Sequence, residues 1–452
     1  MMAVGNPKGT RDFNPTQLAK REYIQRCIES TYKKYGFLKI ETPAFEHLDT
    51  LTGKYGNEGD KLLFKILNSG DFLSKVPPID LIEKNSAQVI KQLSKKGLRY
   101  DLTVPFARFV VQHQNDIVFP FKRYQIQNVY RADRPQKGRY QEFLQCDADV
   151  IGTASLLPEI EFIKIYQSTF EALKLDDFQV FINHRKLLEA MALQVGLSEN
   201  FTAFTVLLDK LDKVPLEKLQ ADFLKLGLKK QDISLIQSWM RPIPFNLEEI
   251  KKLNNTIHES NKLSEAIEEL NFIASNVNSK NAHINLSLAR GLDYYTGCIF
   301  EAKVPQSNIG SLSGGGRYDK LTDGFGLKNM SGAGISFGLD RIADVLEERN
   351  LWPKNLLETT QVLITQIDSS SLQDIFAIAA ELRKKNIRTE VYPEAKKLKK
   401  QLEYANKQNI PFVITIGEEE KALGKFSLKD MISGRQEILS FEALINQIQK
   451  SI

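Results

Sequence analysis

The sequence predicts an α+β protein with a helical insertion and a C-terminal α/β region. Strand-like alternation appears between residues 37 and 149, and a Gly-rich, β-rich stretch returns at 286–345. Residues 185–282, between these stretches, are rich in Leu and Lys at helical spacing. From residue 361 onward, continuous apolar runs alternate with helical patterns, which indicates a separate domain with a parallel sheet.

The first region opens with a well-marked helix. Asn14 is a suitable N-cap, Pro15 suits the first helical position, and Gln17 can complete a capping box. Gly36 ends this helix. Strands are then expected at 37–42, 62–66, 98–105, 121–132 and 143–149.

The connecting segments of this region show no chemical motif of their own. Residues 49–60 are expected to form a polar loop, and the Lys-rich segment 74–97 an inserted helix or hairpin. In the helical region, Pro215 begins a helix that ends at Gly227. The C-terminal strands are expected at 362–367, 388–392 and 411–417.

Composition excludes several classes of protein. The chain has 452 residues, enough for two to four domains, and is 42% hydrophobic. Its three cysteines are far apart and form no CxxC pair, so neither a zinc ribbon nor a disulfide framework is expected. The net charge of +5 permits a polyanionic partner without arguing for one. No apolar run approaches the ~18 residues of a membrane span, and no signal peptide is recognisable, so we expect a cytoplasmic protein.

Residues 123–152, RYQIQNVYRADRPQKGRYQEFLQCDADVIG, contain the most informative pattern. One strand carries Arg131 and Asp133, and a cationic loop follows it. Alternation places one aromatic and three polar side chains of the next strand on one face: Phe143, Gln145, Asp147 and Asp149. This face and loop suit a charged nucleotide with a small polar substrate, although a solvated basic hairpin has the same pattern. Neither GxxxxGK[ST] nor GxGxxG occurs, so ATP would have to be bound by side chains.

The stretch resembles motif 2 of class II aminoacyl-tRNA synthetases, specifically the histidine–tRNA ligase family of bacterial type. The other matching segments are KGTRDF (8–13), GFLKIETPAFE (36–46, motif 1), LRYDLT (98–103), ARGLDYYTGCIFE (289–301), SGGGRYDKL (313–321) and GAGISFGLDRI (332–342, motif 3). Taken alone, SGGG also fits a turn. The resemblance implies an antiparallel sheet flanked by helices and a C-terminal anticodon-binding domain.

The implied domains divide the chain into five parts. The catalytic domain comprises 1–184 and 283–350, interrupted by the helical insertion 185–282. Residues 351–360 form a linker, and 361–452 form the anticodon-binding domain. Motif 1 implies a homodimer.

The resemblance also implies how ATP, with Mg²⁺, would be bound. Arg131 and Arg341 clamp its phosphates, because the planar guanidinium can bind two phosphate oxygens at once. Arg139 holds the outer phosphates, and Phe143 stacks on adenine. Asp133 stands where the class commonly has a longer Glu beside the adenine. No metal bound directly by the protein is expected.

Arg290 and Arg131 are the implied catalytic residues. Arg290 would stabilise the charge that develops as the histidine carboxylate attacks the α-phosphorus of ATP. The resemblance also implies which residues bind histidine. The α-amino group is bound by Asp101, Thr103 and Gln145, and the imidazole by Asp149 and Tyr295. Tyr294 lines the pocket. Outside the resemblance, the two tyrosines also fit ordinary aromatic residues of a sheet core.

Contacts with the histidine tRNA are implied for four residues. Arg134 and Gln136 lie in the motif 2 loop, which meets the acceptor end in bacterial-type members. Glu418 and Lys429 are candidates for the anticodon domain, whose nearly balanced charge requires recognition by shape and hydrogen bonding. The helical insertion would pack on the acceptor stem.

Two alternatives remain at the level of sequence. The first is the synthetase-like regulatory subunit of ATP phosphoribosyltransferase, which typically lacks the C-terminal domain and has an eroded motif 2 loop. The second is a degenerate synthetase domain that senses uncharged tRNA, usually beside a kinase and without RGLDYY. This chain has the loop, the C-terminal region and RGLDYY, which favours the ligase.

Overall fold

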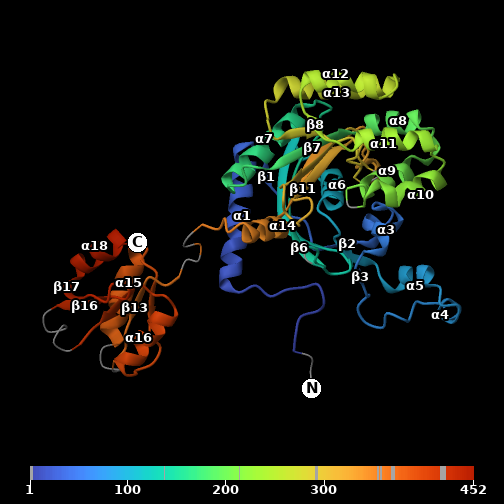
Figure 1. Ribbon diagram of the computed structural model, residues 1–452. Helices are drawn as coiled ribbons and strands as arrows, with labels where there is room; N and C mark the ends of the chain where they lie inside the picture. The colour runs from blue at the N-terminus through green and yellow to red at the C-terminus, as the bar shows by residue number, and fades with distance from the viewer. Residues whose placement is uncertain are drawn as a thin grey trace. The chain divides into compact units, whose positions relative to one another are not determined.

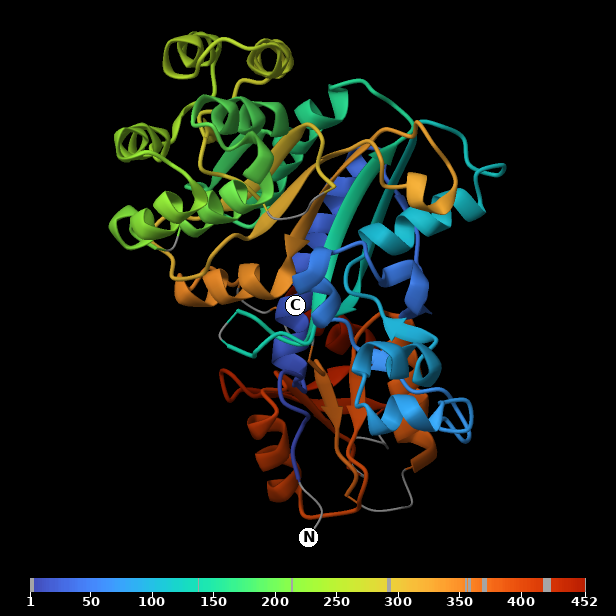
Figure 2. The same cartoon turned by 90° about the vertical axis from the view of Figure 1, so that its right-hand side faces the viewer.

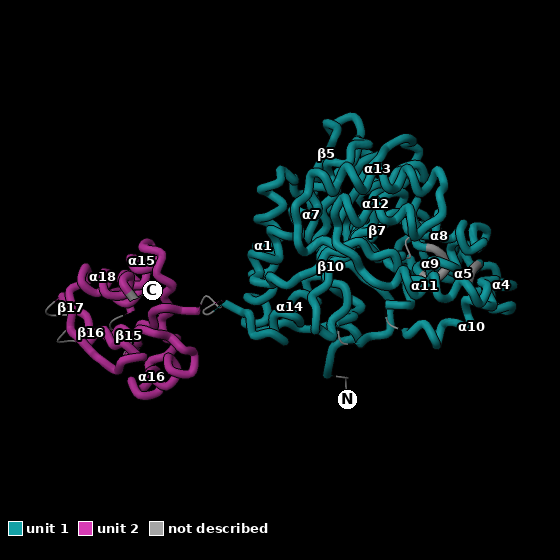
Figure 3. Tube along the Cα trace, turned by 45° about the horizontal axis from the view of Figure 1, so that its top comes forward, with its two compact units in different colours: residues 1–354 teal, residues 355–452 magenta. Residues whose placement is uncertain are grey.

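The computed structural model describes residues 4–136, 138–212, 214–290, 294–353, 356, 359–367, 372–417 and 424–451. The chain divides into two compact units, Met1–Lys354 and Asn355–Ile452, which Figure 3 distinguishes by colour. In the described residues, no helix combines the length and apolarity that crossing a bilayer requires.

Unit 1 is built on a nine-stranded sheet. Its order is β1 (Leu38–Lys39), β5 (Phe121–Tyr130), β6 (Glu142–Ile151), β12 (Gly332–Gly338), β11 (Ser313–Tyr318), β10 (Cys298–Lys303), β7 (Gln179–His184), β9 (Ala282–Ile284) and β8 (Ile243–Pro244). Neighbouring strands are antiparallel except in the pairs β1–β5 and β7–β9. The expected antiparallel sheet is confirmed.

Three helices pack beside this sheet (Figures 1 and 2): α1 (Pro15–Lys34), α7 (Leu157–Ala172) and α14 (Leu339–Glu348). The capping box of Asn14 and Gln17 at the start of α1 is confirmed. From the same helix, the Tyr32 hydroxyl donates to the Cys146 carbonyl of β6 at 2.7 Å, and both side chains are fully buried. The helices therefore cover one face of the strands that carry the polar pattern, which leaves the other face for a site.

The strand expected at 98–105 is wrong. β4 (Lys96–Leu98) ends there, and α6 (Thr103–Gln112) begins. The Asp101 carboxylate accepts the Val104 N–H of the first helical turn at 3.2 Å, and Pro105 is tolerated in that turn.

The polar loop expected at 49–60 is wrong as well, since short helices α2 (Leu48–Leu51) and α3 (Gly56–Lys61) form there. β4 pairs with β2 (Phe45–His47) and β3 (Lys65–Ile66) in a small separate sheet. The segment 74–97 is helical, with α4 (Pro78–Ile82) and α5 (Ser86–Leu93).

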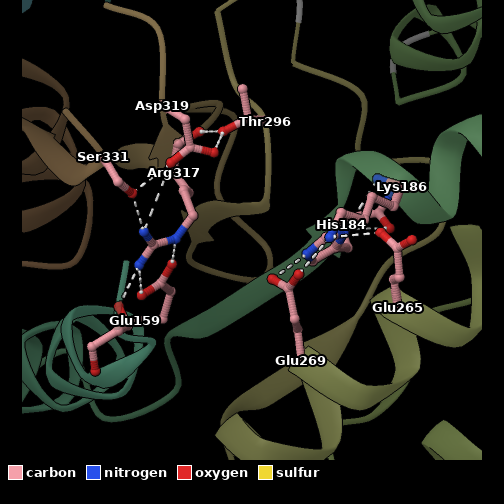
Figure 4. Close-up of polar contacts among 11 residues, drawn as sticks. Glu159, His184, Lys186, Glu265, Glu269, Thr296, Arg317, Asp319 and Ser331 are labelled. Carbon is pink, nitrogen blue, oxygen red and sulfur yellow. Dashed lines mark hydrogen bonds and ion pairs between the residues drawn. The ribbon is translucent and has the colours of Figure 1, made fainter. Parts of the chain in front are cut away.

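The helical segment comprises α8 (Arg185–Gln194), α9 (Phe201–Lys210), α10 (Leu216–Leu226), α11 (Ile233–Trp239), α12 (Leu247–Thr256) and α13 (Asn261–Asn276). Gly227 ends α10 with a φ of 110°, as expected of a C-terminal glycine. These helices share one hydrophobic core with the sheet. They are also joined to it by polar contacts (Figure 4): His184 Nε2 at the end of β7 lies 3.0 Å from Glu269 of α13.

Unit 2 contains a five-stranded sheet in the order β14 (Thr389–Val391), β13 (Val362–Ile364), β15 (Phe412–Thr415), β16 (Lys425–Asp430) and β17 (Gln436–Ser440). The first three strands are parallel, as expected. β16 and β17 add antiparallel strands that the sequence reading missed. Helices α15 (Leu372–Lys384), α16 (Leu398–Lys407) and α18 (Phe441–Ser451) accompany this sheet.

Candidate active site

The register of three neighbouring strands builds the floor of the site. On β6, residues 145, 147 and 149 alternate toward one face. Asp147 lies opposite Gln125 of β5 and Ser336 of β12. The polar face predicted from the sequence therefore lies on an interior strand of the large sheet, between β5 and β12.

This face opens into a cavity of ≈ 320 Å³. Twelve residues that the resemblance implied for ATP, histidine or catalysis line it together: Asp101, Thr103, Arg131, Asp133, Arg139, Phe143, Gln145, Asp149, Arg290, Tyr294, Tyr295 and Arg341. They come from both halves of the interrupted sheet domain, so the fold brings together segments separated by the helical insertion.

Four arginines line this cavity: Arg131, Arg139, Arg290 and Arg341. Burial, followed by repulsion from Arg290, Arg139 and Arg131, lowers the pKa of Arg341. Arg341 donates to the Ser311 carbonyl at 2.6 Å, and Arg131 to the Tyr100 carbonyl at 3.0 Å. Arginines that repel one another across an open cavity make a strong site for a multiply charged anion such as a triphosphate.

Arg290 is held beside this cluster by a carboxylate. Its Nη2 donates to Glu301 at 2.8 Å and also to the Ser311 hydroxyl. Burial opposes the charge of Arg290, but Glu301 outweighs it and raises the pKa of the guanidinium. The Nε is buried and has no hydrogen-bond partner among the described residues, so Arg290 retains a donor for a ligand.

The other part of the cavity is acidic. Asp149 accepts the Tyr318 hydroxyl at 2.7 Å and lies 2.7 Å from Arg123 Nη2. Burial raises its pKa, while Arg123 and the tyrosine oppose that rise. Asp101 accepts the Tyr55 hydroxyl at 2.9 Å, and burial raises its pKa as well. Buried carboxylates with raised pKa values stabilise a ligand that brings N–H donors or positive charge.

Two glycines make room for these side chains. A Cβ at Gly314 would lie 2.4 Å from the Arg290 guanidinium, and one at Gly334 would lie 2.0 Å from Asp149 Oδ1. The SGGG segment is therefore no turn. It forms strand β11, and its lack of side chains lets the arginine lie flat against the sheet.

A second polar cluster, which includes Thr296, Arg317 and Asp319, adjoins the tyrosines in the chain (Figure 4). Tyr294 and Tyr295 line the cavity with ring centroids 4.8 Å apart. The next residue, Thr296, donates to Asp319 at 2.5 Å. Asp319 thus holds the segment that carries both rings, so they are more than filling of the core.

Some predicted residues lie elsewhere. Arg134 and Gln136 are exposed in the loop between β5 and β6 and do not line the cavity. Lys429 lies on β16 of unit 2, and Glu418 lies outside the described residues. The three cysteines are free, and two of them, Cys146 and Cys298, are buried. Within the described part of the chain, no cluster of three metal-ligating side chains occurs.

The sequence reading missed Arg123, Tyr318 and Ser311. The alternation of RYQIQ was visible, but the pairing of Arg123 with Asp149 depends on the register of β5 against β6, which alternation leaves open. Tyr318 lay in a segment, SGGGRYDKL, that resembled the family without a role for this residue.

Comparisons with known proteins agree with this geometry. The family model described as "Histidyl-tRNA synthetase" matches residues 9–74 and 83–342, and an "Anticodon binding domain" model matches 361–451. The histidine–tRNA ligase of Christiangramia forsetii is 49% identical over 451 residues, which cover 97% of each chain.

Solved structures give the same result. The crystal structure of histidyl-tRNA synthetase from Nostoc sp. PCC 7120 superposes with a TM-score of 0.81 at 29% identity, with complete coverage of both chains. A Bacillus halodurans structure described as an ATP phosphoribosyltransferase regulatory subunit/histidyl-tRNA synthetase has a TM-score of 0.72 at 20% identity, covers 92% of this chain and 99% of its own, and shares the fold alone. With matches along nearly its whole length and the class II sheet at its centre, the chain belongs to the histidyl-tRNA synthetase family.

Proposed function

We propose that this protein is a histidine–tRNA ligase that activates L-histidine with ATP and transfers it to the histidine tRNA. One observation carries the proposal: a single cavity combines four arginines with buried carboxylates. This arrangement suits a triphosphate beside an amino acid whose ammonium and imidazole groups donate hydrogen bonds.

In the first step, the histidine carboxylate attacks the α-phosphorus of ATP, which gives histidyl-adenylate and releases pyrophosphate. Arg290 stabilises the negative charge on the α-phosphate in the transition state, and Arg131 orients the same region. Arg139 and Arg341 bind the outgoing phosphates, and Phe143 stacks on adenine beside Asp133. Since little covalent chemistry falls to the protein, positioning and charge stabilisation supply most of the acceleration.

Mg²⁺ accompanies ATP in this proposal. Because the described residues contain no cluster of three metal-ligating side chains, phosphate oxygens and water would supply most of its ligands, as Mg²⁺ prefers. Its chemistry would be to neutralise the pyrophosphate leaving group.

Histidine is selected by the acidic part of the cavity. Asp101, Thr103 and Gln145 bind the α-amino group, Asp149 and Tyr295 bind the imidazole, and Tyr294 closes the wall. Tyr318 and Arg123 hold Asp149 in position through the contacts described above.

In the second step, a ribose hydroxyl of the terminal tRNA adenosine attacks the adenylate, and AMP leaves. Arg134 and Gln136 are proposed to contact the acceptor end, and Lys429 and Glu418 the anticodon. We place the reaction in the bacterial cytoplasm, in a homodimer joined through motif 1. The bacterial relatives and the motif 1 segment support these assignments.

A histidine-dependent exchange of labelled pyrophosphate into ATP tests the proposal. The ligase requires exchange with histidine and none with other amino acids, followed by charging of histidine tRNA. Absence of exchange in the folded protein would favour the regulatory subunit of ATP phosphoribosyltransferase instead.

A further inference from the structure

Two carboxylates of the cavity have no role in the mechanism above, Asp147 and Asp340, and Asp340 is already paired with Arg11 and Arg21. Asp147 lies on β6 midway between Gln145 and Asp149, lines the cavity, and is only 2% exposed. Its neighbours across the strands are Gln125 and Ser336.

Hydrogen bonds and ion pairs distinguish Asp147 from Asp101 and Asp149, the two carboxylates proposed to bind histidine. Asp149 is bonded to Tyr318 and ion-paired with Arg123, and Asp101 is bonded to Tyr55 and to a backbone N–H. Asp147 Oδ1 and Asp149 Oδ2 are both buried without a hydrogen-bond partner within the described ranges, but Asp149 Oδ2 lies 2.7 Å from Arg123 Nη2, whereas no ion pair compensates Asp147 Oδ1 there. Such an atom costs stability in the free protein and therefore indicates a ligand that supplies the missing donor.

Charge indicates what kind of donor is missing. Burial raises the pKa of Asp147 to about 7, with Asp149 and Asp101 adding repulsion, while Arg123 and a hydrogen bond from Ser336 oppose the rise. Asp101 and Asp147 line the same cavity. Arg123 is already ion-paired with Asp149, so a cation between Asp147 and Asp101 would relieve the repulsion that remains.

We propose that Asp147 is a further specificity-determining residue, whose Oδ1 accepts a hydrogen bond from the α-ammonium of bound histidine. The inference rests on the proposed function and deepens it. The ammonium carries a full positive charge at working pH, whereas the imidazole is mainly neutral and has Asp149 and Tyr295 as partners. In this proposal the ammonium lies between Asp101, in the segment before α6, and Asp147 of the sheet.

The test compares ligands that differ in the ammonium group. Asp147→Asn keeps the shape of the side chain and removes its charge. We expect calorimetric titration at about pH 8 to give at least ~10-fold weaker binding of histidine and of histidinol, both of which carry the ammonium. Binding of 3-(imidazol-4-yl)propionate, which lacks it, should be unchanged or tighter, and ATP binding unchanged.

Two further variants keep the result interpretable. Asp147→Ala removes the carboxylate without leaving an amide and must give the same change in selectivity. The control is Asp319→Asn. Both oxygens of Asp319 are already bonded within the protein and the residue does not line the cavity, so this variant must leave the ratio of histidine to propionate affinity unchanged.

An equal loss for the propionate analogue would overturn the assignment to the ammonium, and an unchanged histidine affinity would remove Asp147 from the binding site. A wild-type protein that binds no histidine would defeat the proposed function instead, so the two failures are distinguishable.

Discussion

Two polar clusters on the same sheet differ in how completely their buried polar atoms are hydrogen-bonded. In the cluster around Arg317, the guanidinium donates to both Glu159 oxygens at 2.5 and 2.8 Å and to Ser331 at 2.7 Å. Asp319 accepts from Ser331 and Thr296, both at 2.5 Å. Figure 4 shows these groups pointing toward one another. Around Asp147, in contrast, two carboxylate oxygens and two arginine nitrogens are buried without a hydrogen-bond partner among the described residues: Asp147 Oδ1, Asp149 Oδ2, Arg123 Nε and Arg290 Nε.

This difference indicates that the Arg317 cluster stabilises the fold and that the groups around Asp147 bind a ligand. A satisfied buried network stabilises one arrangement of its elements, and here it fixes the segment that carries Tyr294 and Tyr295. An unsatisfied one costs stability and is retained where a substrate supplies the partners. Substitutions in the first cluster should therefore affect stability, and substitutions in the second should affect binding and rate.

The largest effect is expected for Asp149→Ala. A site that loses the carboxylate paired with the imidazole should bind histidine up to ~10⁴-fold more weakly, because its buried partners are left unpaired. ATP binding should change little, which separate titrations of the two substrates would establish. Equal losses for histidine and ATP would contradict the assignment.

Glu159→Gln should produce the next largest effect, on stability. Glu159 is fully buried against Arg317, and breaking such a pair costs about 3–5 kcal/mol because an uncompensated charge remains. Urea denaturation should reveal the loss. The matched control is Glu248→Gln in the exposed pair with Lys252, which should leave the denaturation midpoint nearly unchanged. Similar denaturation midpoints for Glu159→Gln and wild type would show that the Arg317 cluster does not stabilise the fold.

Arg290→Ala should slow histidine-dependent pyrophosphate exchange by roughly 10²–10³-fold, the usual loss for one donor to a transition state. The free energy of unfolding should fall less than in Glu159→Gln, since Arg290 has an unsatisfied nitrogen in the free protein. Steady-state kinetics separates the rate from the KM for ATP, and near-normal exchange would rule out the catalytic role.

The smallest effect is expected for Asp147→Asn, which should gain stability. The pKa of Asp147 rises from 3.8 to about 7 on folding, so the folded protein binds more protons between these values and loses stability as pH rises through them. Asn carries no such penalty. The variant should exceed wild type by on the order of 1–3 kcal/mol at about pH 8, with a smaller gain at about pH 5.

The groups that face Asp147 from its neighbouring elements are unchanged in this comparison: Arg123, Asp101, Asp149, Ser336 and Tyr295. A variant less stable than wild type at both pH values would mean that Asp147 supports the fold.

Much of the site could be predicted from the sequence, because strand alternation alone places Gln145, Asp147 and Asp149 on one face. The capping box of α1 was equally local. The predictions that were wrong or missing concerned contacts between residues distant in sequence. The chain after Leu98 looks like a strand until the Asp101 side chain accepts an N–H of the first turn of a helix, and the pairing of Asp149 with Tyr318 requires the order of β6, β12 and β11. Two antiparallel strands of unit 2 were missed because their alternation is weak and partly exposed.

The most direct test of the contrast between the two clusters measures stability and histidine affinity together, in Asp147→Asn and Asp319→Asn. Thermal denaturation and histidine titration of each variant at about pH 8 give the two quantities. We expect opposite changes: Asp147→Asn gains stability and loses histidine affinity, whereas Asp319→Asn loses stability and keeps its preference for histidine over the propionate analogue. If both variants lose stability and both retain wild-type histidine affinity, the unsatisfied groups around Asp147 do not mark the substrate site.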